Sequence, residues 1–290
     1  MRERKNVVLL FSKVPAVGLV KTRLSTLKDG IFTPETASVL YHCMLFDVVE
    51  IIMAALDDFE AEQARLREQG VEPDVRDTYE LVISTTPEPS AEAMRSLFED
   101  AGAWPRDFEV IVDTGANFDE HYNHAFAQCW ERGADCILSM GADMPALTKA
   151  DVRIGFQQLH RLDATPGGGI VLAPDQEMGV SVVGWTRETE FSHTGVFYNT
   201  DGLTVLPAYI KKAAERKLPV LWLPPIPDVD TMADFYHNVT LVHALNYCAQ
   251  FDDICPPWRC AKAFDEMGYH DIIVAPNGLL DPRDHIDVQG

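Results

Sequence analysis

The sequence has few positive charges for its length, and this shortage excludes several classes of partner. Its 45 Asp and Glu residues outnumber its 24 Lys and Arg residues, which leaves a formal net charge of -21. An acidic balance of this size argues against nucleic acid or an anionic membrane surface as the partner. Any anion site must therefore depend on a local cluster of cations or on a bound metal ion.

Long apolar runs and paired cysteines are also missing from the sequence. We find no apolar run that approaches a membrane span, and Met1 to Lys5 lead into a short strand rather than a signal peptide. None of the six cysteines forms a C-x-x-C pair, which predicts reduced thiols in a cytoplasmic protein. Cys255 and Cys260 are close in sequence, and we interpret them as packing residues, with a redox pair or partial metal site as the alternative.

Alternating strand and helix patterns predict the fold class. The chain has 290 residues and is 47% apolar, enough for a full core. Strand patterns lie over 6–11, 80–84, 109–113, 135–140, 169–173, 179–184 and 220–223. Helical patterns separate most of them, so we expect one α/β domain over 1–249, with a mostly parallel central sheet and helices on both faces. Residues 250–290 are expected to form a C-terminal appendage with a helix over 259–267 and a strand over 271–275.

A cationic loop follows the first predicted strand. Residues 9–24 read L-L-F-S-K-V-P-A-V-G-L-V-K-T-R-L, and this stretch contains Lys13, Gly18, Lys21 and Arg23. A first strand that runs into a flexible, cationic loop is how many α/β proteins bind phosphate groups. An ordinary connection with solvated basic residues is the alternative. We favour phosphate binding because the rest of the chain is so acidic.

Three aspartates follow two other predicted strands. Asp143 comes after the strand at 135–140, and Asp228 and Asp230 come after the strand at 220–223. The carboxyl ends of parallel strands meet at one edge of a sheet, so these carboxylates can converge. Such hard oxygen ligands suit Mg²⁺, or Mn²⁺, that carries the phosphates of a nucleotide. The alternative for Asp230 is that it only caps the helix that follows.

Two weaker signals lie between these motifs. Thr85, at the end of the strand over 80–84, could contact a base or ribose, although a turn is the simpler interpretation. His121 and His124 lie one turn apart on a predicted helix. A metal pair is conceivable there, and an ordinary helix surface is the interpretation we favour.

Three motifs together resemble a known family. They are the stretch over 9–24, G-A-D-M-P-A-L-T over 141–148 and D-V-D-T-M-A-D-F over 228–235. In combination they resemble a bacterial family of unknown function in the glycosyltransferase-A superfamily, similar to phospholactate guanylyltransferase and molybdenum cofactor guanylyltransferase. The resemblance covers about residues 5–245.

The resemblance implies a fold, a ligand and roles for individual residues. It implies a nucleotide-diphospho-sugar transferase fold that binds a nucleotide on its N-terminal half. Lys13, Lys21 and Arg23 would contact the triphosphate, and Asp143 and Asp230 would hold a divalent metal. Relatives often carry an Asp-Gly-Gly turn where this chain has D-Q-E-M-G over 175–179, and residues 193–198 also depart from the expected acceptor pocket. The second substrate therefore stays open.

Three functions are compatible with these residues. The first is a nucleotidyltransferase, in which the oxygen of a small phosphorylated or phosphonate acceptor attacks the α-phosphorus of a nucleoside triphosphate and pyrophosphate leaves. The second is a glycosyltransferase that uses a nucleotide sugar, but residue 141, two before Asp143, is glycine, so the usual D-x-D pair is missing. The third is a non-catalytic nucleotide-binding protein. A homodimer formed through the appendage is a further option.

Overall fold

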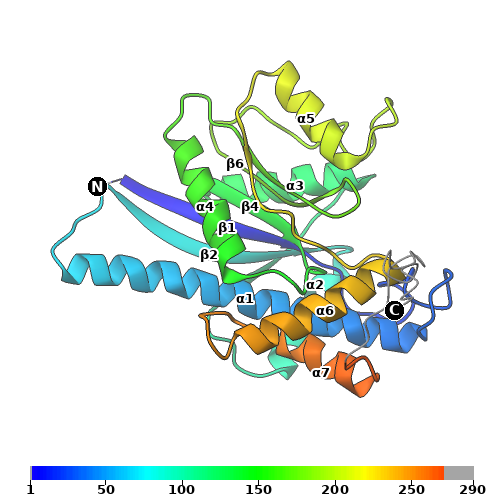
Figure 1. The fold of residues 1–290 in the computed structure, drawn as a ribbon. Coiled ribbons are helices and arrows are strands. Elements are labelled where there is room, and N and C mark those ends of the chain that lie inside the picture. The colour runs from blue at the N-terminus through cyan, green and yellow to red at the C-terminus, as the bar shows by residue number, and fades with distance from the viewer. Residues whose placement is uncertain (1, 271–290) are drawn as a thin grey trace, which may run out of the picture.

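The computed structural model describes residues 2–270 and contains a seven-stranded sheet flanked by helices (Figure 1). The sheet order is β3-β2-β1-β4-β6-β5-β7, and only β6 runs antiparallel to its neighbours. The strands are β1 (Arg2–Phe11), β2 (Val75–Thr85), β3 (Glu109–Val112), β4 (Cys136–Gly141), β5 (Ile170–Pro174), β6 (Val180–Thr186) and β7 (Val220–Trp222). The α/β class with a mostly parallel sheet is confirmed. The strand expected over 271–275 lies outside the described residues.

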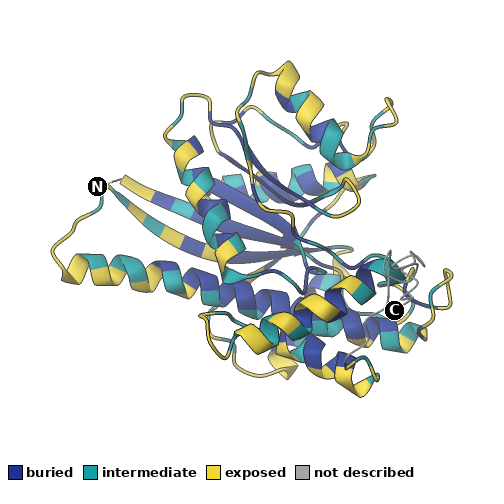
Figure 2. Cartoon of the chain, viewed as in Figure 1, coloured by how far each residue is buried: buried dark blue, intermediate teal, exposed yellow. Residues whose placement is uncertain are grey.

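Helices cover both faces of the sheet. They are α1 (Pro34–Glu68), α2 (Pro89–Asp100), α3 (Phe118–Glu131), α4 (Lys149–Asp163), α5 (Val205–Glu215), α6 (Met232–Cys248) and α7 (Trp258–Glu266). One apolar cluster joins the sheet to α1, α2 and α4, and a second joins it to α3 and α5. In β1, Val8 and Leu10 pack into the first cluster while Val7 and Leu9 pack into the second. Burial on both faces explains the missing alternation (Figure 2).

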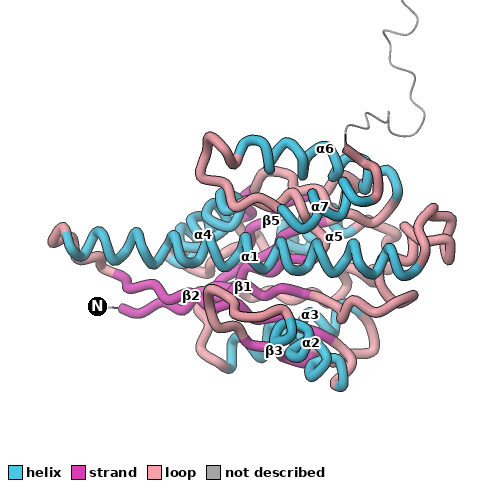
Figure 3. Tube along the Cα trace, turned by 90° about the horizontal axis from the view of Figure 1, so that it is seen from below, coloured by secondary structure: helices cyan, strands magenta, loops and turns pink. Residues whose placement is uncertain are grey.

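Helix α1 corrects the expectation that the chain has no long apolar run. It contains an 18-residue window of mean hydropathy 1.9, which is long and apolar enough for a membrane span by length and composition. In the structure 72% of that window is buried. The helix contacts β2, α4 and α7, so most of its circumference faces protein (Figure 3). Asp47 and Glu50 interrupt this apolar stretch, so the sequence shows no unbroken apolar run there.

The first two strands begin earlier than the sequence predicted. Arg4 in β1 is only 7% exposed, and its guanidinium binds both carboxylate oxygens of Asp77 in β2, at 2.6 and 2.9 Å. A two-pronged pair of this kind allows charged residues inside a sheet.

Helix α7 packs into the body of the protein although it lies beyond residue 249. Cys260 and Phe264 are buried in a third apolar cluster, together with Met44 of α1 and Phe235 of α6. The carboxylate of Asp47 in α1, 1% exposed, accepts a 2.7 Å hydrogen bond from the backbone N–H of Cys260. Cys260 is thus a packing residue, as predicted. The domain boundary at residue 249 stays a prediction.

The sheet topology determines where a ligand can bind. The chain builds β1, β2 and β3 toward one side of the sheet and continues with β4 on the other side of β1. The loops after β1 and β4 therefore diverge and leave a crevice at the carboxyl ends of these strands, the usual ligand position in open α/β sheets.

Candidate active site

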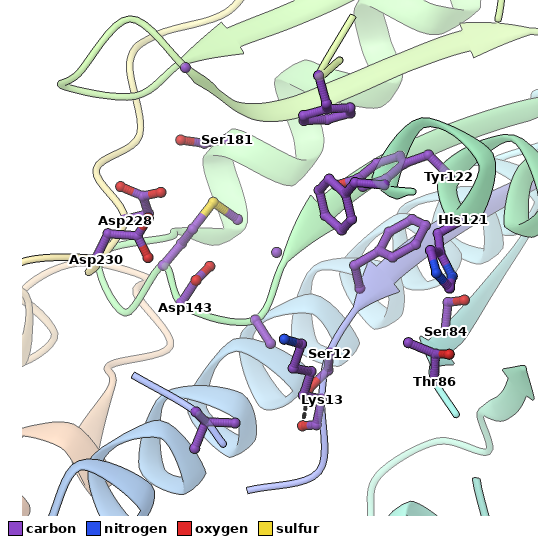
Figure 4. A pocket seen from close by; sticks show the side chains of 18 of the residues that line it. Ser12, Lys13, Ser84, Thr86, His121, Tyr122, Asp143, Ser181, Asp228 and Asp230 are labelled. Atoms are coloured by element: carbon purple, nitrogen blue, oxygen red, sulfur yellow. Dashed lines mark hydrogen bonds between the residues drawn. The ribbon is translucent and has the colours of Figure 1, made fainter. Parts of the chain in front are cut away.

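A cavity of about 760 Å³ lies at the carboxyl ends of β1, β2, β3 and β4. Every residue predicted for the site lines this cavity except Gly18, whose neighbour Leu19 does so instead. Figure 4 shows the aspartates at one end and Ser84, Thr86 and His121 at the other. The predicted residues that line it are Lys13, Lys21, Arg23, Thr85, Asp143, Asp228 and Asp230.

Lys21 lies between two of the predicted aspartates. Its Nζ is 2.6 Å from Asp143 Oδ2 and 3.1 Å from Asp230 Oδ1, and its side chain is only 6% exposed. Burial by itself lowers the pKa of Lys21, but the charges of Asp143 and Asp230 outweigh it, so the pKa is raised and the ammonium stays charged. Arg23 is 62% exposed and reaches Asp230 Oδ2 at 3.3 Å. The predicted convergence of strand ends therefore brings Asp143 and Asp230 together.

Two local features position these carboxylates. A Cβ on Gly141, the last residue of β4, would lie 2.6 Å from Asp143 Oδ1, so any other residue there would displace this carboxylate. The backbone N–H of Val229 donates to the carbonyl oxygen of Asp143 at 3.0 Å, which ties the loop before α6 to the end of β4. The helix cap is formed by Thr231. Asp230 is therefore not the cap of α6, and its side chain is left to bind cations.

Asp228 has a different environment from the other two aspartates. Its Oδ1 accepts a 3.0 Å hydrogen bond from Gln176 Nε2, which also donates to Asp234 Oδ1 at 2.7 Å. Burial and the charges of Asp143 and Asp230 raise the pKa of Asp228 to about 7. Near neutral pH this carboxyl is therefore partly protonated. The segment over 175–179, where the sequence departs from its relatives, thus supports the aspartate loop through Gln176.

The aspartate end of the cavity fits a divalent cation with two ligands rather than three. Among residues 2–270, no three His, Cys, Asp or Glu side chains are grouped so that they could hold a metal ion. The three-aspartate set expected from the sequence is therefore not formed as a ready-made site. Asp143 and Asp230 still fit the ion, because their hard carboxylate oxygens already converge on one cation, the ammonium of Lys21.

The opposite end of the cavity contains polar residues that sequence reasoning did not assign. Asp113, 2% exposed at the end of β3, accepts from Ser84 Oγ at 2.7 Å and contacts His121 Nδ1 at 2.5 Å. Thr85 Oγ1 is buried and has no hydrogen-bond partner within the described chain. His124 instead accepts from the backbone N–H of Thr114. His121 and His124 therefore do not form a metal pair, and the interpretation of a plain helix surface was wrong for His121.

An aromatic wall closes the side of the cavity formed by α3 and the loop over 193–198. Phe11 stacks on Tyr122 with ring centroids 3.8 Å apart. Asp119 of α3, 5% exposed, accepts hydrogen bonds of 2.8 Å from the backbone N–H groups of Gly195 and Phe197. This one carboxylate therefore holds the loop that brings Phe197 to the cavity. In the sequence, residues 193–198 stood out only because they depart from the pattern of the family. Nothing in the sequence indicated that Asp119 binds them.

Comparison with known families matches nearly half of the chain. Residues 74–200 match a family described as an uncharacterized protein conserved in bacteria (DUF2064). The predicted resemblance to a bacterial family of unknown function is confirmed. No curated protein matches this sequence.

One solved structure shares the fold, and two others have lower TM-scores. A candidate nucleotide-diphospho-sugar transferase from Desulfovibrio desulfuricans G20 is 22% identical, with a TM-score of 0.64 over 91% of this chain and 97% of its own. A cytidylyltransferase from Leptospira borgpetersenii is 12% identical, with a TM-score of 0.41 over 95% of this chain and 100% of its own. A manganese complex of Rv0371C from Mycobacterium tuberculosis is 20% identical, with a TM-score of 0.37 over 82% and 98%. The first likeness confirms the nucleotide-diphospho-sugar transferase fold.

Proposed function

We propose that this protein is a divalent-metal-dependent nucleotidyltransferase that moves a nucleoside monophosphate from a nucleoside triphosphate to a small phosphorylated or phosphonate acceptor. One observation carries the proposal: cations from the loop after β1 and carboxylates from two other segments meet at one end of a single cavity. The other end contains aromatic side chains and the Asp113–His121 pair, and about 760 Å³ is enough for a nucleotide-sized ligand. A ligand with a charged tail and a planar head matches this division.

Each charged residue has a part in the transfer. Lys13, Lys21 and Arg23 bind phosphate oxygens and stabilise the charge that builds up on the leaving pyrophosphate. Asp143 and Asp230 hold the divalent ion, which supplies neutralisation of the phosphate charge when it is bound. The acceptor oxygen forms a bond to the α-phosphorus, and the bond from the α-phosphorus to the bridging oxygen of pyrophosphate breaks. An acceptor oxygen that is already ionised needs no general base, so catalysis here is mostly positioning.

Glycosyl transfer from a nucleotide sugar is the competing function. Such enzymes commonly bind the diphosphate through two carboxylates at one strand end. Here Gly141 occupies the first of those positions, and the second carboxylate comes from the distant Asp230. The extra cations of the loop after β1 also suit three phosphates better than two.

Ligand-dependent melting separates these functions. A ligand that binds only the folded protein raises its melting temperature. We expect one nucleoside triphosphate, in the presence of Mg²⁺ or Mn²⁺, to stabilise the protein more than any nucleotide sugar. A larger shift with a nucleotide sugar would instead assign the glycosyltransferase, and no shift with either would overturn catalysis on nucleotides.

The variant Asp143→Ala tests the metal-holding role. We expect it to lower metal-dependent release of pyrophosphate at least a hundredfold, because one of the two carboxylates is lost, and to remove the metal-dependent part of the thermal shift. Asp74→Ala is the matched control, since Asp74 is exposed in the connection before β2, outside the cavity lining. Full metal-dependent turnover in Asp143→Ala would show that the site is assigned wrongly.

A further inference from the structure

The position between Asp143 and Asp230 is already taken by a cation of the chain itself. Lys21 Nζ bonds to one oxygen of each carboxylate, and only 6% of the Lys21 side chain is exposed. Among the described residues the ammonium has no other anionic partner within ion-pair distance. The ring of Tyr41 lies 5.9 Å away and adds a weak cation–π contact. The ammonium is therefore held as a bound ion would be.

Lys21 and a divalent ion would compete for this place. The ion would bind the same two carboxylates, at about 2.1 Å for Mg²⁺, and the ammonium already occupies Asp143 Oδ2 and Asp230 Oδ1. An ammonium left beside it would face a doubly charged cation at short range in a partly buried site, where the repulsion is strong. This repulsion favours one cation at a time between the two carboxylates.

The loop around Lys21 is suited to a change of partner. The residue has a positive φ of 45°, an unfavourable conformation for a side chain with a Cβ. It lies between β1 and α1 in a segment without regular helix or strand, held by turns such as the 3.0 Å hydrogen bond from Leu24 N to Lys21 O. Lys13 and Arg23 line the same cavity, so phosphate oxygens bound there would offer the Lys21 ammonium an alternative anion.

We infer that Lys21 is a competitive occupant of the metal site: in the free protein its ammonium excludes a divalent cation from Asp143 and Asp230, and the triphosphate releases the site by binding Lys21. This inference rests on the proposed function, because it takes the same two carboxylates as the metal ligands. It adds an order of events. The free protein binds the divalent ion weakly, and the ion enters with the polyphosphate.

Binding of Mn²⁺ in the absence of nucleotide tests this directly. The loss of the free Mn²⁺ signal in electron paramagnetic resonance reports binding without any turnover. We expect Lys21→Met, which keeps an unbranched stem and removes the charge, to bind Mn²⁺ at least tenfold more tightly than the unaltered protein. Lys28→Met is the matched control, since Lys28 is an exposed lysine of the same loop outside the cavity lining, and it should bind Mn²⁺ like the unaltered protein.

A second probe measures the other half of the exchange. Inorganic tripolyphosphate with Mg²⁺ should raise the melting temperature of the unaltered protein and of Lys28→Met, and raise that of Lys21→Met clearly less. The inference predicts opposite changes in Lys21→Met: tighter binding of Mn²⁺ and weaker binding of tripolyphosphate. A structural defect would weaken both, and Lys21→Gln provides the same comparison if the methionine variant does not fold.

The possible outcomes separate a failure of this inference from a failure of the proposed function. If Lys21→Met and Lys21→Gln bind Mn²⁺ no more tightly than the unaltered protein, while all three bind it, the competition is wrong and the metal site stands. If none of them binds Mn²⁺, with or without tripolyphosphate, the metal site is wrong and the proposed function fails with it.

Discussion

At the scale of single residues, the roles of the cavity cations can be separated by their exposure. Lys21 is enclosed by carboxylates, whereas Arg23 is 62% exposed and, among residues 2–270, forms one ion pair, with Asp230 at 3.3 Å. An exposed ion pair of this kind contributes little to stability. Arg23 is therefore free to serve a ligand without a large cost to the fold.

Arg23→Ala should weaken triphosphate binding more than monophosphate binding. The guanidinium lies at the carboxylate end of the cavity, where the phosphates beyond the first are proposed to bind, and a charge-assisted bond to phosphate is worth about 1.5–3 kcal/mol. We expect a loss of roughly tenfold or more in affinity for the triphosphate and a change under threefold for the monophosphate, measured by titration calorimetry. Equal losses for the two nucleotides would remove this role from Arg23.

His160 makes stability depend on pH. Its Nε2 lies 2.9 Å from Asn6 Oδ1, and burial, with the positive charge of Arg4, lowers the pKa of His160 to about 4. The unfolded chain binds this proton near pH 6.5 while the folded protein stays neutral. The stabilisation is therefore complete above about pH 6.5 and is lost as the pH falls toward 4, by about 3 kcal/mol for a shift of this size.

The variant His160→Gln removes this titration, together with the charge that His160 presents to Asp77 at 3.6 Å. Its amide can still donate a hydrogen bond to Asn6, but it does not titrate. Urea unfolding measures the unfolding free energy of the two proteins. Between pH 7.5 and pH 4.5 the unaltered protein should lose more unfolding free energy than His160→Gln. Two curves that stay parallel over this range would contradict the pKa shift. The lowered pKa of Asp77, bound to Arg4, acts at more acidic pH.

At the scale of elements, α3 supports the cavity by holding a loop in place. Asp119 binds two backbone N–H groups of the loop over 193–198, and Asn123 Oδ1 accepts a 2.7 Å hydrogen bond from His193 N. These bonds fix the position of Phe197, which lines the cavity. The residues that bind Lys21 belong to other segments, so the two halves of the cavity can be perturbed separately.

Asp119→Ala should loosen this loop and leave the phosphate end intact. Two partly buried backbone N–H groups would lose their acceptor, at a cost of about 0.5–1.5 kcal/mol each, because water can replace it. We expect faster hydrogen exchange over residues 193–198 and weaker binding of the nucleoside triphosphate, whose planar base is proposed to bind at this end, with the affinity for inorganic tripolyphosphate changed less than twofold. Asp201→Ala, which removes only an exposed pair with Lys211, is the control. Unchanged exchange in Asp119→Ala would show that the loop is held by other contacts.

At the scale of the whole molecule, the acidic surface and the cationic loop have opposite effects on a triphosphate. A net charge of -21 repels polyanions at long range, so productive binding must depend on short-range contacts in the cavity and on a divalent ion that lowers the ligand charge. Cytoplasmic location, a homodimer and the boundary at residue 249 remain predictions. The long apolar helix α1 is largely buried, which accounts for its composition within the fold.

Much of the site could be predicted because its signals are local. A glycine turn after β4 and the Thr231 cap depend on neighbours within a few residues, and parallel strand ends must share one edge of the sheet. That reasoning placed Asp143 near Asp230. It could not place Lys21 between them or link Asp113 to His121, because these contacts depend on side-chain directions set by distant segments.

The sequence alone was sufficient for the α/β class, most strand and helix positions, and the identity of nearly all the charged residues in the cavity. Hydrophobic period, capping pairs and turn residues act over a few positions, so they can be recognised without coordinates. Only the tertiary structure revealed the Arg4–Asp77 pair that extends two strands, the docking of α7 on Asp47, and the ammonium held between carboxylates. Each of these contacts joins segments that are far apart in the chain. Its energy depends on the distance between the side chains in space and on their burial, which the spacing of residues in the sequence does not reveal.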